Sequence, residues 1–242
     1  MEWLDDAIVL GSKHFGEGKL VAELFSREHG RYGGVIHGGR RSAPMLQAGN
    51  LVRAGWKARL SDQLGFFSPL ELLEPHAGKL MDSPLALAGL SSAIALVRGA
   101  AAERQAYPQL YDALIVLIEA LPEGELWPPV YARFEIGLLA ALGYGLDLSR
   151  CAVTGETENL AWVSPRTGRA ASLEAGAEYA DKLLRLPPFL IDSSAELKEG
   201  DVADAFALAG FFLERQLYDQ KGEGMPEARR RLIERLGFAG KL

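Results

Sequence analysis

The feature that most constrains the fold is a change of pattern between Pro75 and Pro84. Before it, short runs of β-forming residues alternate with glycines, and after it long stretches are rich in alanine and leucine. Apolar and aromatic runs bounded by turn residues predict short strands, whereas apolar residues at helical spacing predict helices. We therefore expect an α+β protein, with a β domain over residues 1–80 and a helical domain over residues 81–242.

The β part contains five candidate strands: Ala7–Leu10, Leu20–Phe25, Tyr32–Ile36, Arg53–Leu60 and Phe66–Leu73. Short strands separated by turns predict a small antiparallel barrel or sandwich. The fourth run alternates strictly, so that one face carries Arg53, Gly55, Lys57 and Arg59 and the other Ala54, Trp56, Ala58 and Leu60. Trp56 is therefore expected in the core.

The second part predicts helices over Leu85–Arg104 and Gln109–Leu121, and a third that begins at Pro128 and Pro129. Residues 150–173 are rich in turn formers and predict an inserted, non-helical segment. Further helices are expected over Glu174–Leu186, Asp201–Lys221 and Pro226–Leu236.

Composition excludes several classes of protein. Hydrophobic residues make up 48% of the chain and charged residues 24%, which is typical of a protein with a core and excludes general disorder. No apolar run approaches the roughly 18 residues of a membrane span, and Glu2, Asp5 and Asp6 lie where a signal peptide would carry positive charge. The single cysteine cannot form an internal disulfide. A cytoplasmic protein without membrane contact is expected.

The sequence shows no catalytic constellation. The four histidines all lie in the β part, and none forms a pair at metal-ligand spacing on one helix. The glycines at 33, 34, 38 and 39 are not followed by the Lys-Ser/Thr of a phosphate loop. Cys151 has no base near it in sequence, so a buried or turn cysteine is favoured over a nucleophile. We expect no enzyme activity, no cofactor and no metal.

The net charge of −6 hides a basic stretch. Between Arg27 and Arg59, seven Lys/Arg residues face one acidic residue, Glu28. Such a stretch would contact a phosphate backbone and release condensed counterions, and the alternative is a solvated sheet face. The candidate DNA-binding residues are Arg27, Arg31, Arg40, Arg41, Arg53, Lys57 and Arg59.

Several segments, taken together, resemble the RecO family of recombination mediator proteins. They are Ala7–Leu10, Leu24–Gly30, His37–Ser42, Arg133–Glu135, Leu138–Gly145 and Cys151. The resemblance implies an N-terminal OB-fold, a helical C-terminal domain and a role in DNA repair by homologous recombination. Family members bind single- and double-stranded DNA, anneal strands, and work with RecR to load RecA onto DNA covered by single-strand-binding protein. A nucleoid-associated protein would follow. The alternative is a helical protein-interaction module with no direct DNA role.

The resemblance also suggests individual residues. Arg40 and Arg41 match a basic turn of the family, and Arg133 matches an arginine that receives the acidic C-terminal tail of single-strand-binding protein. Gly137 would leave room for an aromatic ring of that tail, and Arg229 lies in a basic segment. Two plainer alternatives stay open. Arg133 could be an exposed helix charge paired with Glu135 or a neighbour, and Arg229 could lie on a solvated helix face.

Some family members carry four zinc-binding cysteines in the turn-rich segment. In this chain Cys151 stands alone: Thr154 takes the next expected ligand position, and Ala170, Ala171 and Ser172 occupy the place of the later pair. One thiolate cannot complete a tetrahedral site. We therefore expect no structural zinc.

Overall fold

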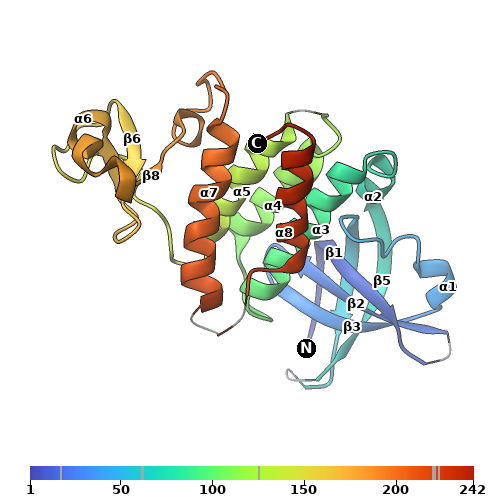
Figure 1. The fold of residues 1–242 in the computed structure, drawn as a ribbon. Helices are drawn as coiled ribbons and strands as arrows, with labels where there is room; N and C mark the ends of the chain where they lie inside the picture. Colours follow the sequence, from blue (N-terminus) through green and yellow to red (C-terminus); the bar gives the residue numbers. More distant parts are fainter. Residues whose placement is uncertain (17, 61–62, 125, 220–221, 223) are drawn as a thin grey trace. The chain divides into compact units, whose positions relative to one another are not determined.

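The computed structural model describes residues 1–16, 18–60, 63–124, 126–219, 222 and 224–242 (Figure 1). The chain divides into two compact units, Met1–Gly124 and Glu125–Leu242. Within the described residues, none of the helices combines the length and apolarity needed to cross a bilayer.

The first unit is built on a closed five-stranded barrel, whose strands are neighbours in the order β1-β2-β3-β5-β4. The strands are β1 (Glu2–His14), β2 (Lys19–Ser26), β3 (Gly30–His37), β4 (Leu51–Lys57) and β5 (Gly65–Glu74). The short helix α1 (Gly39–Ser42) lies between β3 and β4. This strand order with that helix is the OB-fold, and all five expected strands are confirmed. The fourth ends at Lys57, so Arg59 follows the strand.

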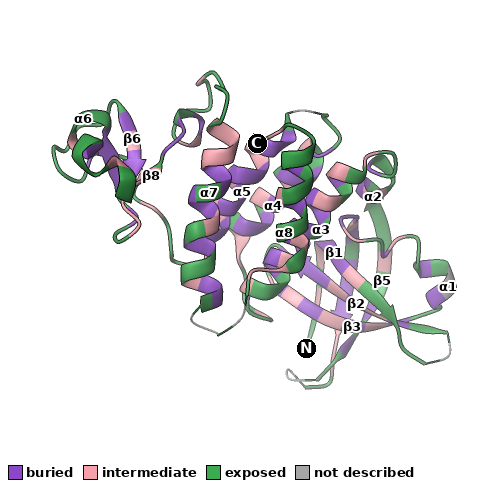
Figure 2. Ribbon diagram, in the orientation of Figure 1, coloured by how far each residue is buried: buried purple, intermediate pink, exposed green. Residues whose placement is uncertain are grey.

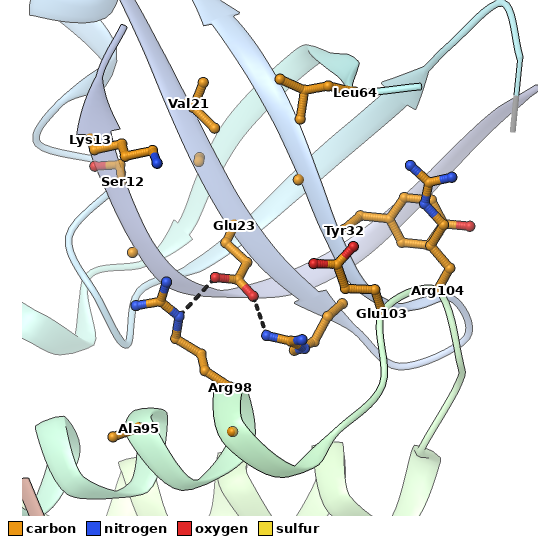
Figure 3. Close-up of a pocket in the computed structure, with 15 residues that line it drawn as sticks. Ser12, Lys13, Val21, Glu23, Tyr32, Leu64, Ala95, Arg98, Glu103 and Arg104 are labelled. Carbon is orange, nitrogen blue, oxygen red and sulfur yellow. Dashed lines mark hydrogen bonds and ion pairs between the residues drawn. The ribbon is translucent and has the colours of Figure 1, made fainter. Parts of the chain in front are cut away.

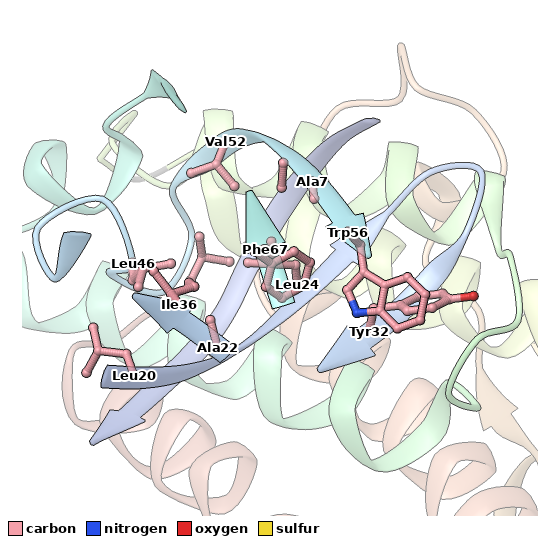
Figure 4. Packing of buried hydrophobic residues seen from close by; sticks show 12 residues of the cluster. Ala7, Leu20, Ala22, Leu24, Tyr32, Ile36, Leu46, Val52, Trp56 and Phe67 are labelled. Carbon is pink, nitrogen blue, oxygen red and sulfur yellow. The ribbon is translucent and has the colours of Figure 1, made fainter. Parts of the chain in front are cut away.

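The barrel interior is filled by buried hydrophobic side chains from every strand (Figure 4). Trp56 is fully buried, packs edge-on against Tyr32 at 4.7 Å between ring centroids, and donates from Nε1 to the Gly33 carbonyl at 3.0 Å. Along β4, Val52 and Ala54 are also buried while Arg53 is exposed. Figure 2 shows buried and exposed residues interspersed along the strands of the barrel. The expected alternation is confirmed from Arg53 to Ala54 and at Trp56, but Gly55 is buried against the backbone of Ser68, and Leu60, expected on the inner face, is 53% exposed because the strand ends at Lys57.

The rest of the first unit includes the helices α2 (His76–Lys79), α3 (Pro84–Ala100) and α4 (Pro108–Ala120). Ser83 begins α3 as its N-cap, because its hydroxyl accepts from the Ala86 amide at 3.3 Å. The helix expected to run to Arg104 ends at Ala100.

The segment after α3 leaves the helix because it covers an open strand edge. β3 pairs with β5 only at Gly34 and Val35, and the free part of that edge forms a parallel bridge between Arg31 and Glu103. The Arg104 amide then donates to the Arg31 carbonyl at 2.9 Å. This tertiary pairing overrides the local helical preference, and it ties the chain beyond α3 to the barrel.

The second unit contains the longer helices α5 (Trp127–Ala141), α7 (Asp201–Leu213) and α8 (Glu227–Phe238). The π-helical turn η3 (Glu214–Tyr218) continues α7. The expected helix over Asp201–Lys221 is therefore α-helical only to Leu213, and residues 220 and 221 lie outside the described part of the chain.

A three-stranded sheet with the order β7-β6-β8 forms from the turn-rich segment and the residues after it. Its strands are β6 (Leu160–Val163), β7 (Ala170–Ser172) and β8 (Leu184–Arg185). The expected helix over Glu174–Leu186 is wrong: the chain forms α6 (Leu173–Gly176), a 3-10 helix η1 (Ala177–Lys182) and then β8. The reason is packing around Trp162, because Gly176 fits against its ring and Arg185 from β8 lies over it at 4.3 Å. A second 3-10 turn, η2 (Pro188–Leu190), leads on toward α7.

Candidate nucleic-acid interface

The basic row on β4 faces outward as expected, but acidic residues of β1 lie beside it. Glu2 is in register with Lys57 and Asp6 with Arg53. The ion pairs measure 2.7 Å between Lys57 Nζ and Glu2 Oε1, and 2.8 Å between Arg53 Nε and Asp6 Oδ1. The hydrogen bond to Asp6 raises the pKa of Arg53. These two cations are therefore compensated by the neighbouring strand.

Arg27 and Arg31 are also paired. Arg27 donates from Nε and Nη2 to both carboxylate oxygens of Asp112 at 2.9 and 3.0 Å. This fork raises the pKa of Arg27 and lowers that of Asp112. Arg31 pairs with Glu23, whose other oxygen lies 2.8 Å from Arg98 Nε. Four of the seven expected DNA-binding residues thus have carboxylate partners.

Arg41 and Arg59 are exposed, and neither forms an ion pair with a carboxylate in the described residues. The side chain of Arg40 lies outside the described part of the structure. Arg41 is on α1, at the end of the barrel where the β1–β2 turn also lies: the Gly39 amide donates to the Gly18 carbonyl at 2.9 Å.

Two lysines at the same end of the barrel were missed by the sequence reasoning. Lys13 and Lys19 flank the β1–β2 turn, are exposed, and have no ion pair to a described carboxylate. Phe15 lies in the turn between them and is 51% exposed. We call Lys13, Phe15, Lys19 and Arg41 the barrel-end cluster. In the sequence, Lys13 and Lys19 flank a glycine-rich turn, which is a recognisable basic pattern. This turn lies before the basic stretch Arg27–Arg59 and is therefore not part of it.

A groove of about 940 Å³ lies on the outer face of β1, β2 and β3, with α3 and the segment after it as the opposite wall (Figure 3). Glu23 projects into its centre between Arg31 and Arg98. Arg104 borders it, and its guanidinium lies 5.6 Å from the Tyr32 ring centroid and donates to the Gln63 carbonyl at 2.9 Å. Lys13 is at the rim, so the groove adjoins the barrel-end cluster.

Arg133 and Gly137, the expected partner-binding residues on α5, are both half-buried. Arg133 donates to the Phe189 carbonyl from Nε at 3.0 Å and from Nη2, and its guanidinium lies 5.8 Å from the Phe189 ring. The alternative that paired Arg133 with Glu135 is wrong. Residues two apart on a helix point in nearly opposite directions, and Glu135 is fully buried.

Glu135 instead pairs with Arg229 of α8. The two carboxylate oxygens accept from Arg229 Nε at 2.6 Å and Nη2 at 2.8 Å, and Nη2 also donates to the Phe206 carbonyl at 3.1 Å. Burial lowers the pKa of Arg229, but the Glu135 charge outweighs it and the net shift is upward. The alternative of a solvated helix face at Arg229 is wrong, because its side chain is only 8% exposed.

Cys151 lies in the turn-rich segment, 1% exposed. Burial raises the pKa of its thiol, but hydrogen bonds, among them one from the Thr154 amide at 3.5 Å, outweigh this and lower it to about 6. The donors around it do not fit zinc, since Thr154 directs its hydroxyl to Glu156 at 3.1 Å. Among the described residues, no three His, Cys, Asp or Glu side chains gather into a possible metal site.

Comparisons with known proteins agree on one family. The family model described as Recombination protein O N terminal matches residues 1–76, and Recombination protein O C terminal matches residues 81–223. A DNA repair protein RecO of Rhodospirillum centenum is 50% identical over 239 residues, covering 97% of this chain and 94% of the relative. The protein of the same name from Phenylobacterium zucineum is 47% identical over 244 residues, with both chains fully covered. The chain therefore belongs to the RecO family of DNA repair proteins.

Proposed function

We propose that this RecO-family protein is a non-enzymatic recombination mediator that binds single- and double-stranded DNA and anneals complementary strands. In this proposal it works with RecR to load RecA onto DNA covered by single-strand-binding protein, in the cytoplasm and near the nucleoid. The observation that supports DNA binding most directly is the barrel-end cluster. Its three cations are exposed and have no carboxylate partner among the described residues.

The cluster has the composition that single strands require. Over residues 11–20 and 37–42 the sequence has four Lys/Arg residues and one acidic residue, Glu17. Cations without partners gain the most from a phosphate, because no existing ion pair has to be broken. An exposed aromatic such as Phe15 offers a base a surface on which to stack. Annealing needs no catalytic group, only a surface that screens the repulsion between two backbones.

The test is a titration of labelled single-stranded DNA at several salt concentrations. Lys19→Ala with Arg41→Ala should weaken binding and reduce the slope of log K against log salt by about 1.4, since each contact to a single strand contributes about 0.7. Lys182→Ala with Lys198→Ala is the matched control, because it removes the same charge from exposed positions in the second unit. A double variant in the cluster that binds like wild type would refute the assignment and favour a protein-interaction module.

Protein partners are part of the same proposal. We assign the acidic tail of single-strand-binding protein to the surface around Arg133 and Gly137, where a guanidinium and a residue without a side chain are adjacent on α5. Arg133 already binds the Phe189 carbonyl, so the tail would share this guanidinium with η2. Tail-peptide binding by fluorescence anisotropy should weaken about tenfold in Arg133→Ala. Peptide affinity that does not change in this variant would place the tail elsewhere.

A further inference from the structure

On the floor of the groove in the first unit, the Glu23 carboxylate has a glycine beside it on each neighbouring strand. On β2, Glu23 is in register with Gly11 of β1 and with Gly33 of β3. Neither neighbour has a side chain, so no adjacent residue of β1 or β3 covers the Glu23 side chain, which lies in the groove on the outer face of the sheet (Figure 3). A volume of about 940 Å³ is within the range of pockets that hold small organic groups.

Two arginines hold the Glu23 carboxylate in place but leave part of its hydrogen-bond acceptor capacity unused. Arg31 Nη1 binds Oε1, and Arg98 Nε lies 2.8 Å from Oε2. Each carboxylate oxygen can accept about two hydrogen bonds, so acceptor capacity remains on both. Glu23 is 21% exposed, which leaves its oxygens within reach of a ligand in the groove. Arg31 Nε is buried and has no hydrogen-bond partner among the described residues.

The groove thus has the cations Lys13 and Arg104 and the carboxylate Glu103 along its walls, and the Glu23 acceptor at its centre. On the floor, Arg31 and Arg98 offset the Glu23 charge, so a phosphate would bind to the cations of the groove, including the rim residues Lys13 and Arg104. A phosphate has no N–H to donate to the Glu23 oxygens, which can only accept. A nucleobase edge that carries N–H donors would be attracted to the floor. Leu64, 53% exposed, lines the groove and offers an apolar contact for the face of a ring.

We propose that this groove binds one unpaired guanine of a single strand, with Glu23 as the residue that recognises it. Guanine carries two adjacent donors, the ring N1–H and the exocyclic amino group, which match the two oxygens of a carboxylate, and O6 beside them accepts from an arginine. In a duplex these atoms are paired with cytosine, so the site selects single strands. The inference rests on the proposed DNA-binding function and adds base recognition to it.

The experiment compares three labelled oligonucleotides of about 15 nucleotides, within the length that one OB-fold can contact. One is all thymine, the second has a single central guanine, and the third has inosine there, which lacks only the exocyclic amino group. Wild type should bind the guanine strand about tenfold more tightly than the inosine strand. Glu23→Gln should reduce that ratio to about twofold or less without weakening binding of the thymine strand, because it removes a negative charge from the groove.

Two further variants separate recognition from folding. Gly33→Ala keeps Glu23 but adds a methyl group to the floor, where it would meet only the end of Leu64 at 3.2 Å, and it should also abolish the guanine preference. Glu74→Gln is the matched control, because it removes an exposed, ion-paired carboxylate that does not line the groove, and it should keep the preference.

Three results would overturn the inference. If wild type binds the guanine strand and the inosine strand equally well, guanine recognition is refuted and DNA binding stays intact. A guanine preference that survives in both Glu23→Gln and Gly33→Ala would place recognition elsewhere. Failure of wild type to bind any of the strands at low salt would refute this inference together with the proposed function.

Discussion

The buried ion pair between Glu135 and Arg229 makes a sharp prediction about the second unit. Arg229→Met removes the guanidinium but keeps most of its apolar length, and it leaves the Glu135 carboxylate, 0% exposed, without its partner. The same change removes the donor to the Phe206 carbonyl. Three helices lose their polar link at once, since these groups lie on α5, α8 and α7.

The expected cost follows from this geometry. Removing one member of a buried pair typically costs about 3–5 kcal/mol, because the remaining charge is left without compensation. For a unit of this size, about 4 °C per kcal/mol gives a fall in Tm of roughly 12–20 °C. The double variant Glu135→Leu with Arg229→Met leaves no unpaired charge. Its free energy of unfolding should lie within about 2 kcal/mol of the wild-type value. The main cost is the Phe206 carbonyl, which loses its hydrogen-bond donor.

Calorimetry gives the Tm of both variants and urea unfolding gives their free energy of unfolding. Arg230→Met is the control. Arg230 is adjacent in sequence but exposed, and it pairs with Glu227 on its own helix, so its loss should change stability by less than about 0.5 kcal/mol. A wild-type Tm in Arg229→Met would refute the reasoning. If that variant kept its Tm but no longer bound a partner protein, Arg229 would act at a binding surface, as the family resemblance implies.

The β part could be predicted because its strands are bounded by glycines and alternate in polarity. The outward direction of Arg53 and Lys57 followed from the alternation alone. Their neutralisation did not, since it depends on which strand lies beside β4 and in what register. Glu2 and Asp6 have the same spacing of four residues as their partners, but only antiparallel pairing with β1 turns that spacing into two ion pairs.

Helix ends and buried charges were harder to predict for different reasons. Ala100 ends α3 because the following residues pair with β3, a long-range contact that no local pattern contains. The burial of Arg229, by contrast, had a signal. Leu232 and Leu236 follow it at three and seven residues, so the arginine lies on the apolar stripe of α8 and needs a buried partner.

Three further predictions can be measured directly. Burial and then Lys79 lower the pKa of His76 below 6.5, so protonation favours unfolding: stability is complete above that pH and is lost as the pH falls through it. Tm should therefore drop on acidification less in His76→Gln than in wild type, and equal slopes would contradict this. Gly30 has a φ of +78° and a Cβ there would lie 1.8 Å from a backbone oxygen, so Gly30→Ala should cost at least about 2 kcal/mol in a thermal melt; a smaller loss would show that the segment after α3 can move away. Finally, Glu2→Gln with Asp6→Asn frees two cations on β4. If their neutralisation is what keeps this face from binding phosphates, the variant should bind DNA more tightly, with a salt slope steeper by about 1–2. Affinity and slope that remain at wild-type values would show that this face lies away from the DNA, whatever its charge.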